Sequence, residues 1–269
     1  MHDSPAPGGR GNLRSVSRRE ALGYAVAAPV LFGLGTLGAT LGSQRAVAAD
    51  TKVIDFAKRK ISPDQIKSAG YDGVVVWVSE CRPGADFEAK PVTRDYADAL
   101  RAAGLHMVSN YQYGKPGWPD PSDYTRGHDG GVADARTAQQ LHAAAGGPDS
   151  APIFFSVDDD IDLNTWKGVA LDWFRGLNSV LGVERTGIYG HSRACGWAID
   201  DGVVGHSSTA GHRWAWQTSA WSHGEREARA VLYQAVVDSP STPGIPLGGI
   251  NVDLDDVLAA DYGQWDVSR

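Results

Sequence analysis

The segment 152–160 is an apolar run that ends in three aspartates. Because successive side chains on a strand point to opposite faces, Asp158 and Asp160 share one face, while Ile153 and Phe155 share the other. Glycoside hydrolysis needs one protonated carboxyl group to protonate the leaving oxygen and one carboxylate to stabilise the cationic transition state. We therefore predict that Asp158 and Asp160 form a catalytic pair, with Asp160 as the general acid.

Two other apolar segments carry acidic side chains that face the same way. Asp55 lies between Ile54 and Phe56, and Asp253 alternates with apolar residues in the segment 249–254. Burying several carboxylates together raises the pKa of at least one of them. Tyrosine and glutamine side chains suit the hydroxyl groups of a sugar. The predicted substrate-binding residues are Asp55, Tyr111, Tyr189, Gln217, Gln234 and Asp253.

The elements that must position these residues alternate between short apolar strands and capped helices, which is typical of βαβ units. Helices are expected between Ser62 and Gly70, between Thr93 and Gly104, from about Val132 to Ala145, from Asn164 to Gly182, and after Ser192. The fold class is therefore α/β, an incomplete TIM-like barrel of five βα units followed by three strands with short loops. The eight predicted strands are 53–57, 73–80, 106–113, 152–160, 186–191, 213–219, 228–235 and 249–254.

The first fifty residues are typical of an export signal. Residues 17–22 resemble the twin-arginine signature, residues 21–42 contain no charge, and Ala46-Val47-Ala48 matches the small-residue pattern at a cleavage site. We predict a signal peptide over 1–49, read by the twin-arginine export machinery, and a barrel domain over 50–269. The protein would be secreted or associated with the cell envelope, with no membrane span after cleavage. A retained anchor is the alternative reading of the apolar run.

Charge and motifs exclude several classes of function. The chain carries a net charge of −7, and no cluster of Lys and Arg follows residue 60, so nucleic acid is not an expected partner. Neutral or cationic ligands fit an acidic chain better. No cofactor motif, zinc-binding histidine pair or serine nucleophile elbow is present, and we expect neither a cofactor nor a metal, although the converging carboxylates leave Ca²⁺ or Mg²⁺ as an alternative. Pairing of Cys81 with Cys195 stays open.

Several segments together resemble an actinobacterial family of glycoside-hydrolase-like proteins exported by the twin-arginine pathway. These segments are 109–115, 141–148, 151–160, 186–190, 248–253 and 263–265. That family is distantly similar to the family-25 muramidases, which carry Asp on strand one, Asp-x-Glu on strand four and Asp on strand eight. The resemblance implies that the corresponding residues are Asp55, Asp158, Asp160 and Asp253, with Asp160 in place of the muramidase glutamate.

The resemblance implies an exported cell-envelope protein that acts on a wall glycan such as peptidoglycan. Asp160 is one methylene shorter than the glutamate it replaces, which withdraws the proton donor by roughly 1.5 Å. A barrel that binds glycan without hydrolysing it is therefore the alternative. Both readings predict a cell-wall glycan as the partner.

Overall fold

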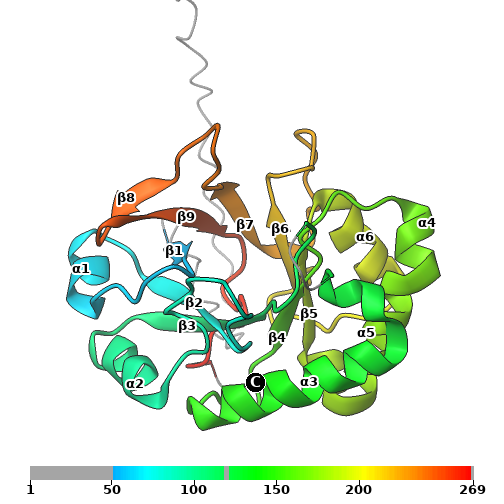
Figure 1. The fold of residues 1–269 in the computed structure, drawn as a ribbon, viewed down its shortest axis with the longest axis horizontal. Helices are drawn as coiled ribbons and strands as arrows, with labels where there is room; N and C mark the ends of the chain where they lie inside the picture. Colours follow the sequence, from blue (N-terminus) through cyan, green and yellow to red (C-terminus); the bar gives the residue numbers. More distant parts are fainter. Residues whose placement is uncertain (1–50, 118–120, 268–269) are drawn as a thin grey trace, which may run out of the picture. The chain divides into compact units, whose positions relative to one another are not determined.

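The strands of the domain close into a barrel. The computed structural model describes residues 51–117 and 121–267. Seven strands neighbour one another in chain order, and β9 closes the ring by pairing with both β7 and β1 (Figure 1). The predicted eight-stranded barrel is thus confirmed. Its strands are β1 (Lys52–Asp55), β2 (Gly73–Trp77), β3 (His106–Tyr111), β4 (Ile153–Ser156), β5 (Thr186–Gly190), β6 (Arg213–Thr218), β7 (Ala230–Val236) and β9 (Ile250–Val257).

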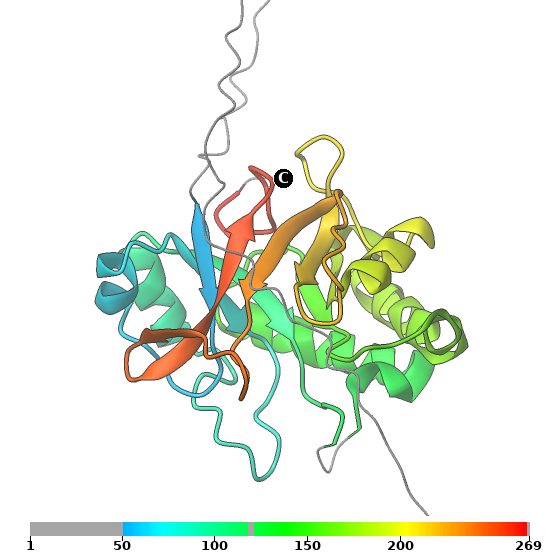
Figure 2. The same ribbon diagram turned by 90° about the horizontal axis from the view of Figure 1, so that it is seen from above.

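The last strand runs in the opposite direction to the other seven. Strands β1 to β7 pair in parallel, whereas β9 is antiparallel to both of its neighbours (Figure 2). The proline-rich connection from β7 contains no crossover helix, and the chain returns antiparallel through it. This connection also contains a ninth strand that the sequence pattern did not predict. That strand, β8 (Ile245–Leu247), forms a hairpin with β9 through Gly248 and Gly249, both of which have positive φ.

Helices follow strands β1 to β5 and lie on the outside of the barrel (Figure 1). Thr93 caps one helix by accepting the backbone N–H of Tyr96, and Asp162 caps another by accepting that of Thr165. None of the helices in the described ranges is both long and apolar enough to cross a bilayer. The helices are α1 (Pro63–Ser68), α2 (Arg94–Ala102), α3 (Gly127–Ala144), α4 (Leu163–Thr165), α5 (Leu171–Leu181) and α6 (Ser192–Asp200), with short turns η1 (Asp123–Arg126), η2 (Trp166–Ala170) and η3 (Val183–Arg185).

Two glycines allow α3 and α5 to pack closely. A Cβ atom on Gly131 of α3 would overlap the carbonyl oxygen of Trp173, and one on Gly176 of α5 would overlap that of His128. Helix α3 begins at Gly127 rather than near Val132, and Gly131 in its second turn serves this contact instead of interrupting the helix.

Replacing Gly176 by Ala is expected to lower the free energy of unfolding by about 1–3 kcal/mol, because the new methyl group forces two helix backbones apart. Urea denaturation measures this change. Gly168 is the matched control, since a Cβ there meets nothing within 4 Å. Gly168→Ala should be neutral or stabilise by up to about 1 kcal/mol. Equal effects of the two substitutions would contradict the packing argument.

Apolar side chains form two layers, one inside the barrel and one between the strands and helices. On β4, Phe154 packs inside, whereas Ile153 and Phe155 pack against the helices, as the alternation of side chains predicts. Cys195 is buried and Cys81 is half-buried, and the two are not bonded to each other. The inner layer leaves the end of the barrel where β1 to β7 terminate open to polar side chains.

Candidate active site

A cavity of about 850 Å³ lies at the end of the barrel where the parallel strands terminate. Chemistry in α/β barrels is placed at this end. Because β9 is antiparallel, its first half reaches the same end, and Asp253 lies opposite Asp55 in the strand register. Side chains from every strand of the barrel line the cavity, among them Asp55, Trp77, Asn110, Ser156, Asp158, Tyr189, Trp216, Gln234 and Asp253.

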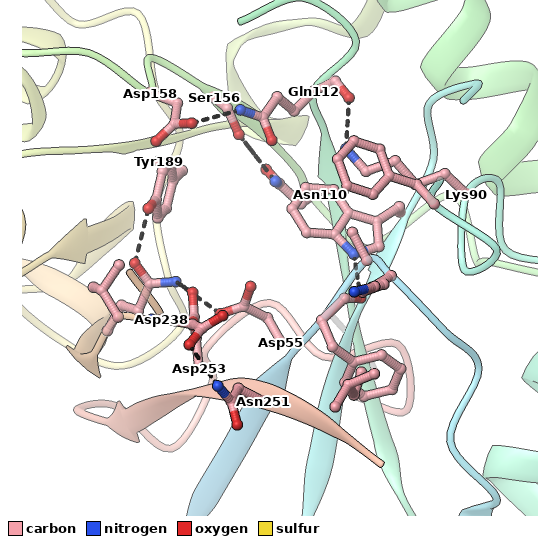
Figure 3. Close-up of a pocket in the computed structure, with 18 of the residues that line it drawn as sticks. Asp55, Lys90, Asn110, Gln112, Ser156, Asp158, Tyr189, Asp238, Asn251 and Asp253 are labelled. Atoms are coloured by element: carbon pink, nitrogen blue, oxygen red, sulfur yellow. Dashed lines mark hydrogen bonds between the residues drawn. The ribbon is translucent and has the colours of Figure 1, made fainter. Parts of the chain in front are cut away.

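A single amide joins two carboxyl groups on one side of the cavity. The Nε2 atom of Gln234 donates to Asp55 Oδ2 at 2.8 Å and to Asp253 Oδ2 at 2.9 Å. Its Oε1 atom accepts a hydrogen bond from the Tyr189 hydroxyl at 2.8 Å, which orients the amide (Figure 3). The backbone N–H of Asp238 donates to Asp253 Oδ1 at 2.6 Å. Four predicted substrate-binding residues therefore lie together in the cleft.

Burial raises the pKa of both carboxyl groups, and Asp253 holds its proton at neutral pH. Burial, followed by the charge of Asp55, raises the pKa of Asp253 to about 8. Burial, followed by the charge of Asp255, raises the pKa of Asp55 well above its usual range. Asp255 lies deeper in the barrel, where Trp216 Nε1 donates to its Oδ1 at 2.6 Å, and burial raises its pKa as well. Asp253 is the least buried of the three and faces the cavity.

The raised pKa of Asp253 predicts a pH-dependent stability. A carboxyl group with a higher pKa when folded than when unfolded stabilises the fold fully below its unfolded pKa of about 3.9, and this stabilisation is lost as pH rises through about 8. Asp253→Asn removes the titrating group. We expect the variant's free energy of unfolding to increase, relative to that of the native protein, by about 1 kcal/mol between pH ~7 and ~9.

Denaturant titrations of the two proteins at both pH values measure this difference. The comparison is made between variant and native protein because Lys90, whose pKa burial lowers to about 7, shifts stability in the opposite direction over this range. If the difference in free energy of unfolding between variant and native protein is the same at both pH values, Asp253 titrates as an ordinary carboxyl group.

Asp158 faces the cavity from the other side and accepts two hydrogen bonds on Oδ2. Gln112 Nε2 donates to it at 2.8 Å, and Lys115 Nζ lies 2.8 Å from the same oxygen. Its neighbour Ser156 also faces the cavity and accepts a hydrogen bond from Asn110 Nδ2 at 2.9 Å. The side chain of Asp158 thus lies across an open cavity from Asp253 (Figure 3).

Asp160 does not face the cavity, which corrects the expectation that it shares the inner face with Asp158. Strand β4 ends at Ser156, so the alternation of side chains stops before Asp160. The exposed Asp160 carboxylate instead pairs with Arg193 at the start of α6, at 2.9 Å. The inward-facing pair at the end of β4 is Ser156 and Asp158, two residues earlier than the predicted pair.

Two predicted substrate-binding residues also lie outside the cavity lining. Tyr111 points outward from β3, and its hydroxyl donates to Asp134 of α3 at 2.6 Å, because Asn110 occupies the inward position. Gln217 is buried beside the inward Trp216 and holds the loop after β6. Its amide donates to the carbonyl of Glu225 at 2.7 Å. Both corrections have the same cause, since a one-residue step along a strand reverses the face.

The strand pattern did not identify four cations that line the cavity in the described part of the chain. Lys58, Arg82, Lys90 and Lys115 come from the segments that follow β1, β2 and β3. The alternation of side chains along a strand does not extend into a loop, so it could not show which way these cations point. Their position between predicted strands and predicted helices was the available signal. In the described part of the chain, no group of three or more His, Cys, Asp and Glu side chains is arranged to hold a metal ion.

The sequence matches the family described as Rv2525c-like, glycoside hydrolase-like domain over residues 64–257. The chain belongs to this family. A relative from Mycobacterium tuberculosis, Rv2525c, provisionally named a peptidoglycan hydrolase, is 36% identical over 253 residues, which cover 93% of this chain and 99% of the relative. The predicted family is thus confirmed.

Solved structures agree with this assignment. The crystal structure of the Tat-secreted M. tuberculosis protein Rv2525c in complex with L-tartrate has a TM-score of 0.71 and 36% identity, covering 80% of this chain and 98% of that one. An uncharacterised B. stearothermophilus protein has a TM-score of 0.52 at 15% identity, covering 79% and 99% of the two chains, and shares the fold. The Tat-secreted relative confirms the predicted export by the twin-arginine pathway. The predicted signal motif itself, at 17–22, lies outside the described residues.

Proposed function

We propose that this protein hydrolyses a glycan of the cell wall, such as peptidoglycan, after export and removal of the segment 1–49. The proposal rests mainly on one observation: a proton-bearing carboxyl group, Asp253, and the carboxylate of Asp158 face the same open cleft at the reactive end of the barrel. Membership of a glycoside-hydrolase-like family and the name of the M. tuberculosis relative support the choice of substrate.

In the proposed reaction, Asp253 donates its proton to the oxygen of the leaving sugar as the glycosidic bond breaks, and a water molecule then adds to the sugar cation and returns a proton to Asp253. Its pKa of about 8 keeps it protonated at neutral pH, as a general acid requires. Asp158, which accepts hydrogen bonds from Gln112 and Lys115, stabilises the positive charge that develops on the sugar ring. The expected general acid, Asp160, has no part in this scheme because its side chain pairs with Arg193 outside the cleft.

The remaining polar residues of the cleft bind and orient the glycan. Tyr189 and Gln234 hold the Asp253 carboxyl in place, while Asn110 and Asn251 offer amides at the cavity wall. The indole ring of Trp77 also lines the cavity, and aromatic rings provide apolar faces for sugar rings.

One contact favours a second candidate, a glycan-binding protein without hydrolytic activity. The ammonium group of Lys115 lies 2.8 Å from Asp158 Oδ2 and neutralises the carboxylate that hydrolysis would use. Lys115 is half-exposed, so a bound glycan can displace it at small cost. Hydrolysis therefore requires that this ion pair open when substrate binds.

The test is release of soluble fragments from purified peptidoglycan and arabinogalactan by the full chain and by Asp158→Asn, with glycan binding measured in parallel. Release by the native protein that Asp158→Asn loses while it still binds would support hydrolysis. Saturable binding without release by the native protein would reject hydrolysis and favour the glycan-binding alternative. Asp160→Asn is the matched control and should release fragments at the native rate.

A further inference from the structure

One wall of the cleft is cationic, although the chain as a whole is acidic with a net charge of −7. Among the described residues, the four cations that line the cavity all come from segments that follow β1, β2 and β3, whereas two of its four aspartates, Asp238 and Asp253, come from the segment after β7 and from β9. A positively charged wall in a negatively charged protein concentrates anions at one place.

Lys90 is one of two buried cations in this set, the other being Arg82. Its side chain is 9% exposed, and its ammonium group lies 3.9 Å from the centre of the Trp77 ring. The ammonium donates to the backbone carbonyl of Gln112 at 2.9 Å and forms no ion pair with a carboxylate in the part of the chain that the structure describes. A buried ammonium has three N–H donors and is costly to desolvate without a counter-ion. An anionic group on a bound ligand would provide this counter-ion.

A second buried cation, Arg82, lies near Lys90, and both face the ring of Phe87. The guanidinium of Arg82 is 5.5 Å from the centre of the Phe87 ring, and the ammonium of Lys90 is 5.3 Å from it. Burial, followed by the charge of Arg82, lowers the pKa of Lys90 to about 7. The fold thus holds two like charges at the cavity wall, where Arg82 Nη1 also donates to the Tyr113 carbonyl at 3.2 Å. An anion beside Lys90 would offset both the cost of its desolvation and the repulsion from Arg82.

We propose that Lys90 and Arg82 form a subsite for a carboxylate or phosphoryl group on the bound glycan, so that the substrate is an acidic glycan. This subsite rests on the proposed function, because it places the charged substituent beside the reacting bond. Gln112 connects the subsite with the residues proposed for hydrolysis. Its backbone carbonyl accepts a hydrogen bond from Lys90, and its side-chain amide donates to Asp158 (Figure 3).

Three monosaccharides with one ring in common test the subsite by calorimetric titration of the full chain. N-acetylglucosamine is neutral, N-acetylmuramic acid adds a carboxylate, and N-acetylglucosamine 6-phosphate adds a phosphoryl group. We expect an anionic sugar to bind about 10- to 100-fold more tightly than the neutral one, the usual gain from hydrogen bonds to a charged group. The sugar that gains more identifies which group the subsite accepts.

Lys90→Met should abolish the preference for anionic sugars, so that the three sugars bind with similar affinities. Lys60→Met is the matched control, since the exposed Lys60 also lies over an aromatic ring, Tyr96 at 5.9 Å, but does not line the cavity. A preference that survives Lys90→Met, or equal affinities of the native protein for the three sugars, would overturn the proposal. So would the absence of any binding of the anionic sugars.

Lys90→Arg keeps the proposal testable if Lys90→Met fails to fold. Raising pH from about 6 to about 9 removes the proton of Lys90 and should weaken the native preference for N-acetylmuramic acid about tenfold, whereas the arginine variant should keep its preference. The other charged or titratable groups that act on Lys90 are Arg82 and Cys81 from its own loop, Asp123 from η1 and Asp158 after β4. Asp253, with a pKa of about 8, also titrates in the cavity over this range. Loss of preference in both proteins would assign the pH effect to those groups and reject Lys90.

Failure of the subsite and failure of hydrolysis give different results. Preferential binding of an anionic sugar without release of fragments from any glycan retains the subsite and rejects hydrolysis. Release at equal rates from neutral chitin oligosaccharides and from acidic wall glycan retains hydrolysis and rejects the subsite.

Discussion

Asp253→Asn is expected to lower the rate of glycan release by about 100- to 10,000-fold while leaving glycan affinity nearly unchanged. The asparagine has the same shape as the aspartic acid and can still accept a hydrogen bond from Gln234, but it has no acidic proton to donate. General acids contribute rate factors of this size. Measuring initial rates and binding constants for the same purified glycan separates the loss of the proton from a loss of substrate affinity.

The neighbouring Asp256→Asn serves as the control for this prediction. Asp256 lies on the opposite face of β9 and pairs with Lys52, so its replacement should leave the rate within about twofold of the native value. The native rate should also fall as pH rises through about 8, where Asp253 loses its proton. A rate for Asp253→Asn within about threefold of the native rate would remove Asp253 from the mechanism.

Asp134→Ala is expected to lower the free energy of unfolding by about 2–4 kcal/mol, because two buried donors lose their acceptor and each costs about 1–3 kcal/mol when unsatisfied. The Asp134 carboxylate is 2% exposed and accepts hydrogen bonds from three parts of the domain. Tyr111 of β3 donates at 2.6 Å, Arg126 at 2.5 Å and Trp173 of α5 at 2.8 Å. Removing the carboxylate leaves the buried donors of Tyr111 and Trp173 without their acceptor, while Arg126 keeps its contact with Asp123.

Urea denaturation measures this loss, and Asp129→Ala provides a control on the same helix. The Asp129 side chain is fully exposed, so its replacement should change the free energy of unfolding by at most about 0.5 kcal/mol. A loss below about 1 kcal/mol for Asp134→Ala would indicate that solvent reaches the buried donors when the carboxylate is removed.

The same buried network positions one wall of the cleft. Asp123 is contacted by Arg126 at 3.2 Å and accepts the backbone N–H groups of Tyr113 and Gly114, each at 2.8 Å. Tyr113 and Gly114 lie between Gln112 and Lys115, the two partners of Asp158. The contacts that stabilise the outer layer of the barrel therefore also fix the loop that sets the environment of Asp158.

Much of the architecture, and the acidic residues on the strands that line the cleft, follow from the sequence alone. Apolar alternation and helix caps located the eight strands of the barrel, since each local signal agrees with the fold that the whole chain adopts. Asp55, Asp158, Tyr189, Gln234 and Asp253 were predicted to face the axis, and all of them line the cavity. Within a strand, a period of two residues determines which way a side chain points.

Tertiary structure alone decided what lies beyond the strand ends and what each group does there. Asp160 and Lys90 lie in loops, where no period relates position to direction, so only the folded chain places one against Arg193 and the other over Trp77. The assignment of Tyr111 and Gln217 required the strand register, because a one-residue step reverses the face. The proton on Asp253 depends on burial and on the charge of Asp55, which the chain brings close only when β9 pairs with β1.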